Sequence, residues 1–124
     1  MRRLLLLLLL AACAPRAEAP RTDIAALAPR GEARRCLLDR DIRDWQLVGE
    51  DYLLAKTGSG WFRNKLIGGC PGLDRRRIVV RTNSVGQACR GDTFGVIDPV
   101  TRNDFGLCRF GDWEPVEVPK GARF

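Results

Sequence analysis

The sequence predicts a small, mainly β domain, an antiparallel barrel or sandwich of the OB-like or SH3-like kind that is stapled by disulfides. Three observations support this prediction. Short apolar stretches follow one another at regular spacing, and glycine-bearing turns separate them. No stretch beyond residue 34 shows a convincing 3.6-residue apolar repeat, the pattern that indicates a helix. Four cysteines lie in the same part of the chain, an even number that suits two disulfide bonds.

The pattern predicts six strands, over residues 44–48, 52–56, 61–67, 77–82, 93–98 and 105–110. Glycine-bearing turns at residues 49–51 and 57–60 join the first three strands. In the third strand, Phe62, Asn64 and Leu66 fall on one face. The fourth strand has the clearest β-branched content. Residues 83–91 are expected to form a loop, and prolines 115 and 119 predict an irregular tail.

The first thirteen residues have the pattern of an export signal. Arg2 and Arg3 precede an apolar run of nine residues, whereas a membrane-spanning helix needs about 20. The segment Leu10-Ala11-Ala12-Cys13 resembles the lipobox of bacterial lipoproteins, which implies acylation of Cys13 and cleavage before it. An ordinary secretory signal cleaved after Ala14 is the alternative, because Ala12-Cys13-Ala14 also fits that type of site.

The expected organisation has four parts. Residues 1–12 form the signal peptide, and residues 13–34 form a lipidated cysteine with a flexible tether, because alanine, proline and charge dominate this segment. Residues 35–118 form the β domain, and residues 119–124 form a C-terminal tail. The expected location is the periplasmic face of the bacterial envelope, with the outer membrane favoured and the inner membrane left open.

The composition argues against several classes of function. The chain has 124 residues, no histidine and a formal net charge of +6. Histidine is the commonest acid–base group at neutral pH and the commonest metal ligand, so we expect neither a metal nor another cofactor. Loss of Arg2 and Arg3 with the signal lowers the charge to +4. This small surplus, together with export, argues against nucleic acid as a partner.

The residues expected to form disulfides are Cys36, Cys70, Cys89 and Cys108. They form no C-x-x-C pair, so neither a zinc site nor a thioredoxin-like redox site is indicated. Four cysteines permit three pairings, and the sequence does not select among them. Proximity along the chain favours Cys36 with Cys70 and Cys89 with Cys108. A nucleophilic thiol is the alternative, but the chain lacks the histidine that usually activates one.

The densest basic cluster in the chain is formed by Arg75, Arg76, Arg77 and Arg81. Guanidinium groups match phosphate geometry, so this cluster is a candidate contact for anionic headgroups, such as lipid phosphates or lipopolysaccharide. The favoured interpretation is a solvated loop that leads into a half-exposed strand, with Asp74 partly neutralising the charge. Arg77, Val79 and Arg81 would form one face of this strand, opposite Ile78 and Val80.

Two further groups of residues have both functional and structural interpretations. Aromatic residues in the hairpin region could stack on a ligand, but in a small β domain they are more often core: Trp45, Tyr52, Trp61 and Phe62. Acidic residues on separate expected turns would form a catalytic pair only if two of them met: Asp92, Asp98, Asp104, Asp112 and Glu114.

A pattern of residues runs through most of the expected domain. It comprises Cys36, Ile42-Arg43-Asp44-Trp45, Tyr52-Leu53-Leu54, Trp61-Phe62, Cys70-Pro71-Gly72-Leu73 and Cys108. This pattern resembles a family of small proteobacterial lipoproteins that is catalogued as a domain of unknown function. Its most specific pieces are the I-R-D-W and C-P-G-L segments. The resemblance implies an envelope location and assigns no catalytic residues.

We therefore expect a membrane-anchored envelope lipoprotein whose domain is a non-catalytic binding module. The membrane is its partner through the N-terminal lipid, and the domain's own partner would be an envelope protein, a glycan or an anionic lipid. Two alternatives stay open. One is a periplasmic hydrolase that uses paired carboxylates, and the other is an inhibitor or accessory of an envelope enzyme.

Overall fold

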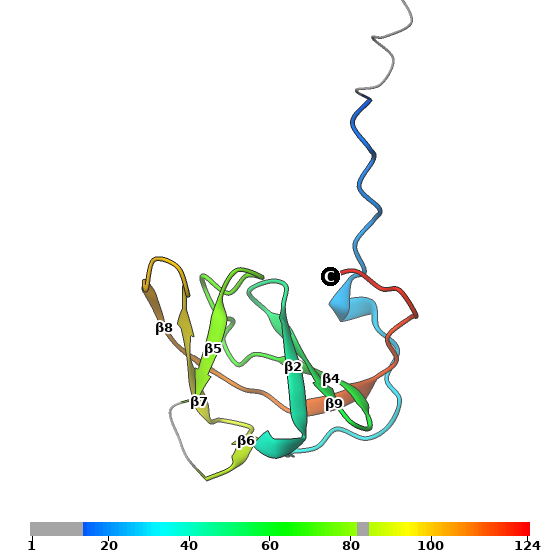
Figure 1. The fold of residues 1–124 in the computed structure, drawn as a ribbon. Helices are drawn as coiled ribbons and strands as arrows, with labels where there is room; N and C mark the ends of the chain where they lie inside the picture. The colour runs from blue at the N-terminus through cyan, green and yellow to red at the C-terminus, as the bar shows by residue number, and fades with distance from the viewer. Residues whose placement is uncertain (1–13, 82–84) are drawn as a thin grey trace, which may run out of the picture.

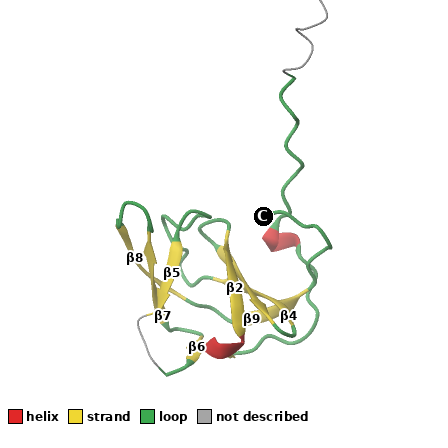
Figure 2. Ribbon diagram, viewed as in Figure 1, coloured by secondary structure: helices red, strands yellow, loops and turns green. Residues whose placement is uncertain are grey.

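The computed structural model describes residues 14–81 and 85–124. In these ranges the chain is mainly β, with two single-turn 3₁₀ helices, η1 (Ile24–Ala26) and η2 (Asp39–Asp41) (Figure 2). The strands are β1 (Cys36–Leu38), β2 (Ile42–Leu47), β3 (Tyr52–Thr57), β4 (Gly60–Lys65), β5 (Ile78–Arg81), β6 (Gln87–Cys89), β7 (Thr93–Ile97), β8 (Asp104–Arg109) and β9 (Trp113–Val116).

The strands pair antiparallel in three sheets. The largest has the order β2-β3-β4-β9, the second has the order β5-β7-β8, and β1 pairs with β6 (Figure 1). A bridge between Ile67 and Arg109 joins the chain after β4 to the end of β8. The prediction of a mainly β, antiparallel and disulfide-stapled domain is confirmed. Of the two architectures expected, the sandwich fits, because the described strands do not close into a barrel.

The core lies between the sheets and is rich in aromatic rings. Phe110 stacks on Phe94 with ring centroids 4.4 Å apart and contacts Trp113 at 5.2 Å. From β4, Phe62 and Asn64 point into this core as the sequence predicted, and both are almost fully buried. Rings from the large sheet and from the β5-β7-β8 sheet therefore meet in one cluster, which holds the sandwich together.

Three strands are absent from the sequence-based prediction. β1 and β6 are three residues each, and β6 lies inside the segment 83–91 that was expected to be a loop. β9 contains Pro115, so the prediction of an irregular tail at this proline is wrong. The proline is tolerated because β9 is the last strand of its sheet and needs no donor at this position. Its carbonyl oxygen accepts a hydrogen bond from the Arg30 N–H at 2.8 Å.

The folded domain extends beyond the expected boundaries of 35 and 118. Ile24 and Leu27 are 5% and 6% exposed, and they pack with Leu54 and Val116 in a second cluster. Phe124 packs against the same cluster. Parts of the segments that were expected to be tether and tail therefore belong to the folded domain. The prediction rested on the average composition of residues 13–34, which is dominated by alanine, proline and charge. It therefore missed Ile24 and Leu27, which the η1 turn brings into the same cluster.

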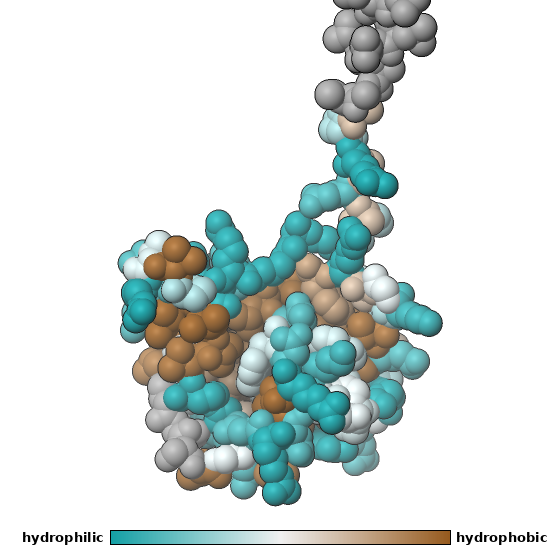
Figure 3. Space-filling model, viewed as in Figure 1, coloured by the Kyte–Doolittle hydropathy of each residue, from teal (hydrophilic) through white to brown (hydrophobic). Residues whose placement is uncertain are grey.

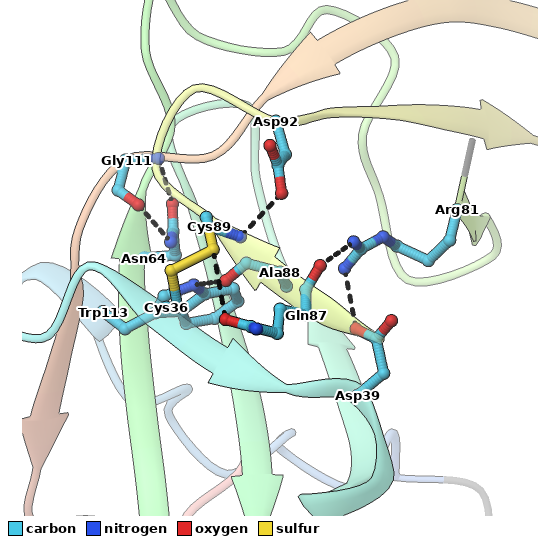
Figure 4. Close-up of a disulfide and its surroundings, with 10 residues drawn as sticks. All are labelled: Cys36, Asp39, Asn64, Arg81, Gln87, Ala88, Cys89, Asp92, Gly111 and Trp113. Carbon is cyan, nitrogen blue, oxygen red and sulfur yellow. Dashed lines mark hydrogen bonds and ion pairs between the residues drawn. A yellow bond between two sulfur atoms is a disulfide. The ribbon is translucent and has the colours of Figure 1, made fainter. Parts of the chain in front are cut away.

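The two disulfides join Cys36 to Cys89 and Cys70 to Cys108. Two bonds were expected, but the pairing favoured by chain proximity is wrong. The register of β1 and β6 sets Cys36 directly opposite Cys89, with Cα atoms 4.0 Å apart (Figure 4). Cys108 lies on β8, which the bridge at Ile67 brings beside the loop that holds Cys70. Strand pairing, and not distance along the chain, therefore selects the partners.

Candidate functional site

A groove lies between the edges of two strands from different sheets. In the described chain β2 pairs only with β3, and β5 pairs only with β7, so both present an unpaired edge. We call this hollow, of about 350 Å³, the β2–β5 groove. Figure 3 shows hydrophobic surface around β5 and beside it. The β2–β5 groove is lined from β2 by Asp44, Trp45, Gln46 and Leu47, and from the β5 side by Arg75, Arg77, Ile78 and Val79.

The floor of the groove is apolar and belongs to the core. Leu47 is 5% exposed, and the half-buried Trp45 and Val79 pack against the same core cluster. Trp45 also stacks on Phe110, with ring centroids 6.1 Å apart. The core thus fixes the Trp45 ring while part of this residue still lines the groove.

The four hairpin aromatics do not form one ligand-stacking face. Trp45 and Phe62 pack in the core between the sheets. Tyr52 and Trp61 pack against the second cluster, which lies on the other face of the large sheet. The structural interpretation of these residues as core is confirmed, with Trp45 in addition exposed to the groove.

The β2 edge of the groove is protected by its own side chains. The Trp45 N–H donates to Asp44 Oδ1 at 2.9 Å, and Gln46 Nε2 donates to Asp44 Oδ2 at 3.0 Å. The register against β3 also shifts between Ile42 and Asp44. Capped backbone groups and bulges both discourage strand addition. In the described ranges no side chain caps the backbone of residues 78–80, so β5 is the open edge.

The predicted arginine cluster separates in the fold, and two of its members point inward. Arg77 pairs with Asp98 and lies over the Phe105 ring, 4.1 Å from its centroid. Its side chain is 13% exposed. Arg81, at 18%, pairs with Asp39 at 3.0 Å (Figure 4). These two arginines are therefore held in structural contacts, and neither forms the solvated face that the sequence predicted.

The solvated face of β5 is apolar instead. Ile78 and Val80 are 45% and 37% exposed, while Val79 between them packs against the core. On β8, Leu107 is 65% exposed. The register joins Val80 to Leu107 through Gly95 of β7, so these side chains share the outer face of the sheet. The expected alternation is correct, but its two faces are reversed, because ion pairs and aromatic rings accept the arginines inside.

Arg75 and Arg76 stay exposed at the approach to β5. Arg76 contacts Asp74 at 3.5 Å, and its backbone N–H donates to Asp74 Oδ1 at 2.7 Å. This backbone hydrogen bond, assisted by the charges of Arg77 and Arg76, holds the pKa of the Asp74 carboxyl below its ordinary value. Arg75 forms no ion pair with any residue in 14–81 or 85–124, and it lines the groove. Arg75 is therefore the member of the cluster that is available to an anionic group.

A second hollow, of about 420 Å³, shares Gln46 and Arg75 with the groove. Its lining also includes Trp61 and Phe124, whose ring centroids lie 6.1 Å apart, and Arg123 from the C-terminal end. Arg75 thus borders two hollows, and both of them combine arginine with aromatic or aliphatic side chains.

Each of the five acidic candidates for catalysis has a local partner. Asp98 pairs with Arg77, Asp112 with Arg90 and Glu114 with Arg63, while Asp92 accepts from the Cys89 N–H and Asp104 from the Gly106 N–H. Within the described ranges, no group of three or more His, Cys, Asp or Glu residues is placed to hold a metal ion.

Sequence reasoning singled out Trp45, Arg75 and Arg77 among the groove residues, and it missed Asp44, Leu47 and Val79 as partners in one site. No local signal could have found them together, because 30 residues separate the end of β2 from the start of β5, and the two strands come together only when the two sheets pack.

The signal peptide, the lipobox and Cys13 lie outside the described residues, so acylation and envelope location stay predictions. In the part of the chain that is described, no helix is long and apolar enough to cross a membrane. Comparison of the chain with protein-family models, with curated proteins and with solved structures finds no match. The resemblance to the small lipoprotein family stays a prediction from the residues that carry it.

Proposed function

We propose that this chain is a lipid-anchored bacterial envelope protein whose β domain binds another envelope component without catalysing a reaction. The observation that carries the binding function is the β2–β5 groove, an apolar hollow between two strand edges with Arg75 at its border. The lipobox at Cys13 supports the anchor. The exposed residues 14–17 support a short tether, because they lead away from the domain (Figure 1).

The chemistry of the groove favours binding over catalysis. An apolar floor with a few polar groups at the rim is typical of binding sites. The Asp44 carboxylate already accepts two hydrogen bonds, and Arg77 is paired with Asp98. A hydrolase of the paired-carboxylate type would need two acids that face a substrate. A partner that is itself an envelope enzyme would make this chain its accessory or inhibitor.

Anchoring is tested by cell fractionation and intact mass of the wild-type chain and of the Cys13→Ala variant. We expect the wild-type chain in the membrane fraction, beginning at Cys13 and carrying acyl mass. The variant should lose both the acyl mass and the cleavage before residue 13. A wild-type chain that begins at Pro15 without acyl mass would contradict the lipid anchor.

Binding is tested in living cells with a photo-crosslinking amino acid in place of Gln46, which lines the groove. The matched control carries the same amino acid in place of Glu117, which is exposed and lies outside both hollows. We expect a discrete adduct from position 46 that position 117 does not give. Equal products from both positions would contradict a binding role for the groove. A turnover abolished by one Asp or Glu substitution would contradict the non-catalytic role.

A further inference from the structure

We infer that the β2–β5 groove takes an extended peptide segment of a partner protein, which adds as a strand to the free edge of β5 and places a carboxylate against Arg75. This inference rests on the proposed function and deepens it by naming the class of partner. Three features of the groove support it: the backbone edge of β5, the apolar floor and the charge at the rim.

The backbone edge favours a polypeptide over a glycan or a lipid. The side of β5 away from β7 presents N–H and C=O groups that no described strand pairs. A peptide backbone supplies donors and acceptors at the matching spacing, and strand addition to a sheet edge is a general mode of peptide recognition. The β2 edge on the opposite wall is less suited to pair with the peptide backbone, because the Asp44 carboxylate already accepts a hydrogen bond from the Trp45 N–H.

The length of β5 sets the length of the bound peptide segment, and the apolar floor of the groove sets its side chains. β5 has four residues, which span about 13 Å at about 3.3 Å per residue. A bound strand of about four to six residues would therefore cover this edge. Its alternate side chains would turn toward Trp45, Leu47 and Val79, so apolar residues are favoured at these positions.

The rim sets the charge and the direction of the segment. Arg75 is exposed and has no ion-pair partner in the described ranges, so it is complementary to an acidic residue. Arg75 lies before the start of β5, and an antiparallel partner ends where β5 begins. The acidic residue therefore belongs at the C-terminal end of the bound segment. At the other wall Asp44 forms no ion pair with a described residue, which favours a basic residue at the N-terminal end of the bound segment.

The test uses the whole chain, purified from the membranes of the cells that make it and kept in detergent. It is applied to an array of acetylated hexapeptide amides that begin with lysine, end with glutamate and vary among valine, isoleucine, leucine and threonine between them. A reversed set begins with glutamate and ends with lysine. Each peptide is also made as two twins, with N-methyl groups on one or the other alternate set of backbone nitrogens.

We expect the lysine-first peptides to bind better than the reversed set. For each binding peptide, one N-methyl twin should lose binding and the other should keep it, because a single edge of the peptide pairs with β5. Absence of binding across both sets would overturn the inference, as would equal binding of the two twins.

The strongest peptide is then titrated by fluorescence polarisation against Arg75→Glu, with Arg76→Glu as the matched control. Both arginines are exposed, but only Arg75 lines the groove. We expect about fivefold weaker binding for Arg75→Glu and less than about a twofold change for Arg76→Glu. Equal effects of the two variants would overturn the contact with Arg75.

The two proposals fail in different ways. An adduct of a glycan or a lipid at position 46, with no peptide bound by the array, would overturn the inference and leave the proposed binding function standing. Absence of both an adduct and a bound peptide would overturn both proposals.

Discussion

Arg63 and Glu114 face each other across the β4–β9 ladder and form an ion pair within the large sheet. The Arg63 side chain is 12% exposed. Its Nη1 also donates to the carbonyl oxygens of Ile24, Ala25 and Leu27, at 2.9, 2.9 and 3.1 Å. The Arg63 guanidinium therefore holds η1 against the large sheet, next to the point where the tether leaves the domain.

Arg63→Met is expected to destabilise the domain by about 2–4 kcal/mol, because a half-buried carboxylate and three carbonyl groups lose their donor. Urea unfolding measures this change, and trypsin should cleave after Arg30 sooner than in the wild-type chain. Arg40→Met is the control, since that side chain is 82% exposed and should shift stability by less than about 0.5 kcal/mol. Wild-type stability of Arg63→Met would show that the segment is held by apolar packing alone.

The two disulfides are expected to be reduced in a fixed order. Cys70 and Cys108 are 0% and 6% exposed, whereas Cys36 and Cys89 are half-buried. A reductant therefore reaches the Cys36–Cys89 bond first. Partial reduction of the folded chain, followed by alkylation and peptide mapping, should label these two cysteines before the others. The opposite order would contradict the burial argument.

Removal of either disulfide is expected to destabilise the domain by a similar amount. The bonds close loops of 53 and 38 residues, for which the chain-entropy model gives about 4 kcal/mol each. Paired Cys→Ala variants, compared by denaturant unfolding, measure both values. A much larger loss for Cys70 and Cys108 would show that their buried packing contributes beyond the entropy of the unfolded chain.

Asp98 is expected to make the domain less stable in acid. The backbone N–H groups of Thr101 and Val100 donate to its carboxylate at 3.0 and 2.8 Å. These bonds, with the charge of Arg77, hold the pKa of Asp98 below its ordinary value. Such a group stabilises the fold above the pKa of the unfolded chain, and this contribution is lost as the pH falls through the folded pKa.

The thermal midpoint should therefore fall as the pH drops below about 4, and less steeply for Asp98→Asn. Asp41→Asn, which removes an exposed carboxyl, is the control for a change in net charge. Equal acid dependence of the wild-type chain and Asp98→Asn would rule out Asp98 as the source.

Asn64 is expected to be required for the turn between β8 and β9. It is fully buried, its Nδ2 donates to the Gly111 carbonyl at 2.9 Å, and its Oδ1 accepts from the Gly111 N–H at 2.7 Å (Figure 4). Asn64→Leu leaves both backbone groups buried without partners and should cost about 2–4 kcal/mol. Denaturant unfolding tests this value, with Asn103→Leu at an exposed turn as the control.

The sequence alone determined the secondary structure that depends on neighbouring residues. Glycine turns and β-branched runs located β2, β3, β4, β5, β7 and β8 to within a few residues, because these signals act over short distances along the chain. The consecutive apolar residues Leu53, Leu54 and Ala55 also indicate a strand that is buried on both faces, which the sequence-based prediction did not include. Three consecutive buried residues belong to a strand covered on both faces, and η1 and the C-terminal end cover the second face here.

The tertiary structure alone decided which residues meet. Alternation along β5 places Arg77 and Arg81 on one face and Ile78 and Val80 on the other. It does not say which face is buried, and the aromatic rings and acidic residues that pack against Arg77 decide that. The disulfide pairing and the β2–β5 groove have the same origin. Both follow from which strand edges pair and which are left free, and that choice is made by contacts between residues far apart in the chain.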